Sequence, residues 1–193
     1  MTSIIKVDAI QMSNGDTPSI SDMGFSALTA TDMPAGSVIQ IVQTVKTDTA
    51  SITGNIFVEV PGYSVSITPQ SASNKVMIDV CLHVGETQDA FPVFRMYRND
   101  TELQIASPAA AGTSGMFGKT TTQNSSRDPY LLEPVNFKFL DTPNSTSALT
   151  YTIKCRPFGN DTSRVIHFNR SSTVGDANQY TVISTFTATE IAG

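Results

Sequence analysis

The sequence is short of charged side chains, and it lacks long basic or apolar runs. Charged residues make up 15% of the 193 residues, against roughly 25% in a typical soluble domain. The net charge is −5 and no basic stripe is present to neutralise phosphates, which argues against nucleic-acid binding. No apolar run reaches roughly 18 residues, so we expect no membrane insertion. The first residues do not resemble a secretory signal peptide, so we do not expect export by the secretory route.

Metal ligands and nucleophiles are also few. His83 and His167 lie far apart in the sequence, whereas zinc sites need three or four ligands. There is no G-x-S-x-G elbow, and no spacing among the acidic residues selects the facing pair that sugar cleavage requires. We therefore predict no enzymatic activity, no cofactor and no metal. Cys81 and Cys155 fall within predicted strands, where buried thiols are expected and a disulfide is the alternative.

Serine and threonine are abundant where charge is scarce, and together they make up about a quarter of the chain. Threonine favours strands because its branched Cβ suits a pleated, half-solvated surface. A threonine-rich, charge-poor chain therefore indicates much exposed or half-exposed sheet.

Period-two alternation predicts strands throughout residues 35–193. It is most regular over 75–84, where five aliphatic residues share one face. Asn99-Asp100 predicts a hairpin turn. The alternation of apolar and polar residues assigns Phe137, Phe139, Tyr151 and Ile153 to the core. Turn residues separate the predicted strands, as in a sandwich or barrel. The strands span residues 38–46, 56–60, 63–68, 75–84, 91–98, 135–139, 149–156, 165–168 and 180–190, with a weak one near 116–122.

Residues 1–34 differ from this β-sandwich domain. The segment is rich in turn and small polar residues and cannot build a core of its own. Ile4, Ile5, Val7 and Ile10 are nevertheless costly to leave in water, at about 1.5–3 kcal/mol for each large aliphatic side chain. We predict that these four residues attach the chain to something else, which can be the sandwich, a neighbouring copy or another protein.

A long loop from about residue 107 to 128 has few apolar residues apart from Met116 and Phe117. Loops of this length usually have a function or are mobile. Met116 and Phe117 are the candidates for an exposed contact surface on this loop. The alternative is an ordinary loop between strands or between subunits.

Six short stretches of the sequence belong together: ITPQSASNKVMI (67–78), FRMYRNDT (94–101), FLDTPNS (139–145), LTYTI (149–153), TEI (189–191) and, near the start, IKVDAIQ (5–11). Taken in this order, they resemble the tail-fibre-like proteins of marine and cyanobacterial phages. Their order along the chain, more than any one of them, carries the resemblance.

The resemblance implies an all-β, jelly-roll-type sandwich of about eight to ten antiparallel strands, of the kind compared with C1q and TNF heads. It also implies a homotrimer on the exterior of a virion, assembled in the host cytoplasm. Residues 1–34 would then bind other phage proteins of the tail or capsid, and the sandwich would face outward. A contact with a host glycan or protein stays open. The chain has almost no shaft, so a capsid decoration protein is the alternative to a short fibre, and a glycan-cleaving tailspike is a third hypothesis.

Overall fold

The computed structural model describes residues 32–86, 90–104, 106–107, 114–118, 130–157, 162–173, 175, 177 and 179–193. These residues form eleven strands, two of which contain only two residues. The strands are β1 (Val38–Lys46), β2 (Ala50–Thr53), β3 (Val58–Ile67), β4 (Lys75–Glu86), β5 (Pro92–Arg98), β6 (Thr101–Glu102), β7 (Phe117–Gly118), β8 (Glu133–Asp141), β9 (Leu149–Pro157), β10 (Val165–Phe168) and β11 (Ser184–Ile191).

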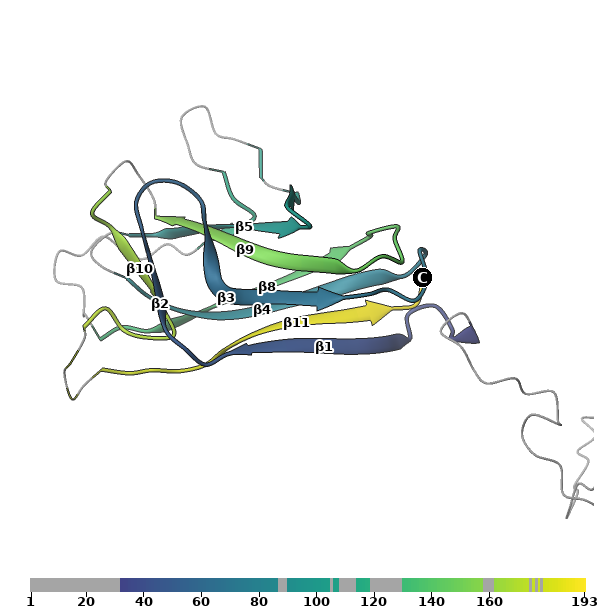
Figure 1. Ribbon diagram of the computed structural model, residues 1–193, viewed down its shortest axis with the longest axis horizontal. Helices are drawn as coiled ribbons and strands as arrows, with labels where there is room; N and C mark the ends of the chain where they lie inside the picture. The colour runs from purple at the N-terminus through teal and green to yellow at the C-terminus, as the bar shows by residue number, and fades with distance from the viewer. Residues whose placement is uncertain are drawn as a thin grey trace, which may run out of the picture.

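The strands form two packed antiparallel sheets (Figure 1). Sheet A contains six strands in the order β1-β11-β4-β10-β2, with β8 on β4 as well. The long strand β4 makes this possible, because β11 pairs with residues 75–81, β10 with residues 84–86 and β8 with residues 76–84. Sheet B contains β3-β9-β5-β6, with β7 also on β5.

This strand order is that of a jelly roll, in which two Greek keys fold over one another. The first long strand pairs with the last, giving β1-β11-β4-β8 in one layer, and β3-β9-β5 forms the other. The predicted all-β sandwich is therefore confirmed.

The core lies between the sheets and follows the predicted alternation. Val76, Ile78, Val80, Leu82 and Val84 of β4 are all fully buried. Tyr151 and Ile153 of β9 face them and are equally buried, as the sequence predicts. Each large aliphatic side chain buried in this way contributes about 1.5–3 kcal/mol to stability.

One local prediction needs correction, one strand was missed, and one prediction is confirmed. Pro61-Gly62 does not separate two strands, because β3 runs through it with a shift of register between Glu59 and Ser64. Such a bulge accommodates a proline that lacks an N–H and a glycine with positive φ. The short strand β2 gave no recognisable alternation in the sequence. Asn99 and Asp100 have φ of 46° and 64°, as expected of the predicted hairpin turn.

The chain enters and leaves the sandwich at the same end. The amide of Gly36 donates to the carbonyl of Ala192 (2.8 Å), and the amide of Ala192 donates to the carbonyl of Ser37 (2.9 Å). In Figure 1 the C-terminus and the start of β1 lie together at the right. The connections β2–β3 and β10–β11 lie at the opposite end. The sandwich thus has a proximal end, where residue 37 begins the fold, and a distal end.

Candidate functional site

The predicted attachment residues Ile4, Ile5, Val7 and Ile10 lie outside the described residues, and their role stays a prediction. The predicted contact residues Met116 and Phe117 are described, and both are half-buried rather than exposed at a loop tip. Phe117 belongs to β7, which pairs with β5, and the amide of Met116 donates to the carbonyl of Phe94 (2.8 Å). Any contact role of Met116 and Phe117 must therefore operate from within a packed surface.

Phe117 is the middle ring of an aromatic stack that crosses from one sheet to the other. Its ring centroid lies 4.9 Å from that of Phe94 in β5 and 4.6 Å from that of Phe137 in β8. Both pairs are close to parallel, with interplanar angles of 12°. Aromatic pairs of this kind add about 0.5–1.5 kcal/mol beyond their buried area, so the stack fixes β7 against both sheets.

A cavity of about 330 Å³ opens beside this stack. It is lined by Gln104, Ala106, Met116, Phe137 and Phe139. The sequence assigned Phe137 and Phe139 to the core, but both are only half-buried. Both residues belong to β8, which lies at one margin of sheet A. On that side the described strands of sheet B are β6 and β7, which contain only two residues each and therefore cover β8 incompletely.

The chemistry of the cavity is simple. Its described lining residues contribute two aromatic rings, a thioether, a methyl group and one amide, and none of them titrates near neutral pH. Such a surface suits apolar groups, with Gln104 able to orient a polar one. The lining residues that the structure describes include no pair of carboxyl groups for hydrolysis of a glycosidic bond.

The outer face of sheet A carries several exposed apolar side chains among polar ones. Ile41 and Val45 of β1 are 64% and 46% exposed, and Leu140 of β8 is 44% exposed. Met77 and Cys81 of β4 lie on the same face and are half-buried. Threonines fill most of the outward positions of β11. The exposed or half-exposed threonine-rich sheet that the composition predicted is therefore this face.

The outer face of sheet B has the opposite character. Arg95 of β5 lies opposite Lys154 of β9 in the ladder. The Arg95 guanidinium lies 4.0 Å from the ring centroid of Phe57 and forms an ion pair with Glu102 (3.1 Å). The Lys154 ammonium lies 4.1 Å from the ring centroid of Tyr97. Cations stacked on aromatic rings remain compatible with solvent, so this face needs no partner to cover it.

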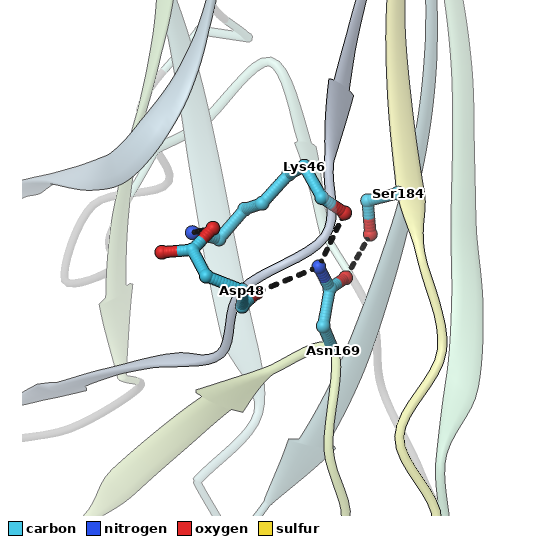
Figure 2. Close-up of polar contacts among 4 residues, drawn as sticks. All are labelled: Lys46, Asp48, Asn169 and Ser184. Carbon is cyan, nitrogen blue, oxygen red and sulfur yellow. Dashed lines mark hydrogen bonds and ion pairs between the residues drawn. The ribbon is translucent and has the colours of Figure 1, made fainter.

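A buried polar cluster at the distal end ties three strands together (Figure 2). The side-chain amide of Asn169 donates to the carbonyls of Lys46 (2.8 Å) and Asp48 (2.9 Å). Its carbonyl oxygen accepts a hydrogen bond from the hydroxyl of Ser184 (2.5 Å). Lys46 is itself buried, and its ammonium reaches the exposed carboxylate of Asp48 (2.8 Å). Nothing in the local sequence signalled this cluster, because its members come from the ends of β1, β10 and β11.

Two further polar clusters lie toward the proximal end. The carboxylate of Asp141 accepts from Arg98 (2.6 Å) and from the hydroxyl of Tyr151 (2.7 Å), which links the two sheets. Burial, and then the hydrogen bond to Asp141, raises the pKa of Tyr151.

The second of these clusters surrounds Glu190, whose side chain is fully buried. Its carboxylate accepts from the side chains of Gln40 (2.6 Å) and Asn74 (2.6 Å) and from the amide of Gln70 (2.7 Å). Several residues of both proximal clusters fall in the sequence stretches that carry the phage resemblance, and their contacts in the structure are those of packing.

His167 lies on the short strand β10 and is buried, with its Nδ1 2.9 Å from the hydroxyl of Ser51. Burial, reinforced by the charge of Arg170, lowers its pKa from 6.5 to about 4. The imidazole is therefore neutral in the folded protein near neutral pH and becomes protonated readily once the chain unfolds.

The lowered pKa predicts a loss of stability in acid. The pKa of His167 is lower in the folded chain than in the unfolded chain, so protonation favours the unfolded chain. The contribution of His167 to the free energy of unfolding is therefore fully present above pH 6.5 and declines as the pH falls toward 4. A tenfold change in proton affinity corresponds to about 1.4 kcal/mol, so this decline amounts to at most about 3 kcal/mol. Urea unfolding at pH 7 and about pH 4.5 should show a smaller acid loss for His167→Gln than for the natural chain. His83→Gln, which keeps His167, should retain the full loss, and equal losses in all three proteins would contradict this.

The cysteines are free thiols, as expected. Cys155 is buried in the core, and Cys81 is half-buried on the outer face of sheet A. Burial and the neighbouring Asp79 raise the pKa of Cys81, which keeps it protonated and weakly nucleophilic. Among the described residues, no group of three or more potential metal-ligating side chains comes together. No helix in that part of the chain has the length and apolar character needed to cross a membrane.

Comparison with family models and with curated proteins adds nothing to the structural observations. No protein-family model matches the chain, and a search of curated proteins finds no match.

Proposed function

We propose that this chain is a structural protein of a bacteriophage particle, a short homotrimeric fibre on the virion exterior. Residues 1–34 attach it to other phage proteins through Ile4, Ile5, Val7 and Ile10, and the sandwich projects away from the particle. The sequence stretches that resemble phage fibre proteins motivate this assignment. The jelly-roll strand order is consistent with it.

The polarity of the sandwich is the structural observation that supports the proposal most directly. Residues 36 and 37 are hydrogen-bonded to Ala192, so the attachment segment joins the fold at the same end as the C-terminus. An anchor at the proximal end leaves the whole distal end free. Ile56, Tyr180 and Ile183, which are 67%, 60% and 53% exposed, belong to connections at that distal end (Figure 1). Three copies held together would present these side chains three times, and multivalent display strengthens weak single contacts.

The proposal is tested on phage particles produced with variants of the full chain. Ile5→Asp together with Val7→Asp should reduce the amount of the chain in purified particles at least about tenfold, because two buried aliphatic contacts are lost. Ile183→Asp, a change at the distal end, should be incorporated normally. Quantitative mass spectrometry of the particles measures both. Normal incorporation of the double variant would refute the anchoring role of the segment.

Immunogold labelling of the same particles separates the fibre from its alternative. Label at the tail supports a tail fibre, and label over the capsid indicates a decoration protein. Release of reducing ends from host polysaccharide by the purified chain would instead support an enzyme.

A further inference from the structure

We infer that Arg170 and Ser51 form a binding site for the carboxylate group of an acidic sugar at the distal end of the sandwich. This site is separate from the cavity beside β8. It goes beyond the proposed function, and its existence does not depend on the virion role.

Arg170 is a half-buried cation without a counter-charge. It lies at the start of the β10–β11 connection, which belongs to the distal end (Figure 1). Its Nη2 donates to the hydroxyl of Ser51 (3.1 Å) and its Nη1 to the carbonyl of Ser171 (3.2 Å). Both acceptors are neutral, and Arg170 forms no ion pair with an acidic residue in the described part of the chain. Burial lowers the pKa of Arg170, and no described carboxylate offsets this.

Other cations with little exposure are paired in this protein. The side chains of Lys46, Arg95 and Arg98 are 0%, 22% and 24% exposed, and each lies within 3.1 Å of a carboxylate. The chain contains 17 acidic residues against 12 lysines and arginines, so carboxylates are not scarce. Removing water from a cation that has no counter-charge costs free energy, and a bound anion offsets that cost. The missing carboxylate at Arg170 therefore indicates that a ligand supplies one.

The geometry around Arg170 suits a carboxylate. Three of its five N–H groups have no partner among the described residues. The fork of a guanidinium matches the two oxygens of a carboxylate, so these groups are enough to hold one. Ser51 fixes the guanidinium, because its hydroxyl oxygen accepts from Arg170 and lies 2.9 Å from Nδ1 of His167. The imidazole of His167 is neutral near neutral pH, so Nδ1 can accept the hydroxyl hydrogen of Ser51.

The surroundings of Arg170 favour a ligand with hydroxyl groups. Ser51 and Thr53 are exposed on the outer side of β2, opposite His167 and Val165 of β10. Thr181 is also exposed and pairs with Arg170 in an isolated antiparallel bridge. Hydroxyl side chains exchange hydrogen bonds readily with the hydroxyls of a sugar ring, whereas protein partners rely largely on apolar contacts at the centre of an interface. We therefore assign the carboxylate to an acidic sugar, such as a uronic acid.

Nuclear magnetic resonance of the isotope-labelled full chain tests the site. The chain has two histidines, so the imidazole signals of His167 and His83 are easily told apart. Sodium glucuronate, added at constant ionic strength, should shift the His167 signals saturably and leave those of His83 in place. Glucose, which has the same ring without the carboxylate, should shift neither. His167 signals that stay in place with glucuronate would overturn the inference, whatever the variants show.

Two variants that each remove one arginine charge test whether Arg170 holds the ligand. Arg170→Gln should raise the dissociation constant for glucuronate at least about tenfold, because hydrogen bonds to a charged group are lost. Arg95→Gln is the matched control, since Arg95 is also half-buried but already has the carboxylate of Glu102 at 3.1 Å. It should change the constant less than about twofold, because salt screens a charge on the opposite sheet. Equal weakening in both variants would show that overall charge attracts the ligand and would overturn the inference.

A peptide-like acid separates the two sources of a carboxylate. N-acetylglutamate α-amide carries a single carboxylate and no sugar hydroxyls, so it should bind more weakly than glucuronate. Equal or tighter binding would assign the site to an acidic peptide and overturn the acidic sugar. Glucuronate binding by a chain that is missing from phage particles would refute the virion role and leave this site intact.

Discussion

Replacing Asn169 by aspartate is expected to lower the free energy of unfolding by about 3–5 kcal/mol, the cost of a buried, uncompensated charge. The shape of the side chain is kept, but the donor atom becomes an oxygen. That oxygen would face the carbonyls of Lys46 and Asp48 at 2.8 and 2.9 Å, where the amide now donates (Figure 2). Protonation of the new carboxyl group can relieve one of these contacts but not both. Equilibrium unfolding in urea, at one fixed protein concentration, measures the change.

Asn99→Asp is the matched control for this prediction. Asn99 also has a positive φ, of 46° against 60° for Asn169, but it lies exposed in the β5–β6 turn. Its side-chain carbonyl accepts from the amide of Thr150, and a carboxylate can accept the same bond. Its amide donates to Ala148 at 3.3 Å, a long bond whose loss costs little. We expect Asn99→Asp to cost less than about 1 kcal/mol. A similar loss in both variants would mean that burial of the Asn169 cluster does not determine its contribution.

Removing the charge of Asp141 is the second large effect. Asp141 is 8% exposed and pairs with Arg98, which is 24% exposed, at 2.6 Å. The same carboxylate oxygen accepts from Tyr151 in the opposite sheet. Asp141→Asn leaves the guanidinium partly buried without a counter-charge, and breaking such a pair costs about 3–5 kcal/mol when fully buried. Partial exposure of Arg98 reduces this, so we expect about 2–4 kcal/mol in urea unfolding.

Asp79→Asn provides the control for Asp141. Asp79 also lies in a long strand of sheet A and pairs with a cation, Lys138, at 2.7 Å. This pair is exposed, with side chains 42% and 72% accessible, and exposed pairs contribute about 0–1 kcal/mol. The two substitutions are chemically identical, so the difference between them isolates burial and the link between sheets. If Asp79→Asn proved as costly as Asp141→Asn, the link through Tyr151 would not explain the effect.

The clusters around Asn169, Asp141 and Glu190 show what local patterns miss. In the sequence, Glu190 follows a run of threonines and alanine and resembles an ordinary surface residue of a last strand. In the structure it is fully buried, because Gln40, Gln70 and Asn74 come together from β1 and from the turn before β4 to donate to it. Buried polar groups require such partners, and here the partners are more than 110 residues away along the chain.

The candidate site also separates what local sequence patterns predict from what only the tertiary structure decides. The sequence singled out Met116 and Phe117; in the structure Met116 lines the cavity and Phe117 is the middle ring of the aromatic stack. It placed them at an exposed tip, whereas β7 holds them half-buried against β5. Phe137 and Phe139 alternate as core residues do, but alternation reports which face of a strand a residue occupies, not how much of the opposite sheet covers it.

The sequence by itself determined most of the strands, the Asn99-Asp100 turn and the apolar face that forms the core. These follow from the two-residue period of a pleated strand and from backbone preferences that act between neighbours. The tertiary structure decided which strands pair, that β3 passes through Pro61-Gly62, where Glu190 and Asn169 find their partners, and that a cavity opens beside β8. Each of these depends on contacts between distant segments, whose free energies are set by packing and desolvation and leave no periodic trace in the chain.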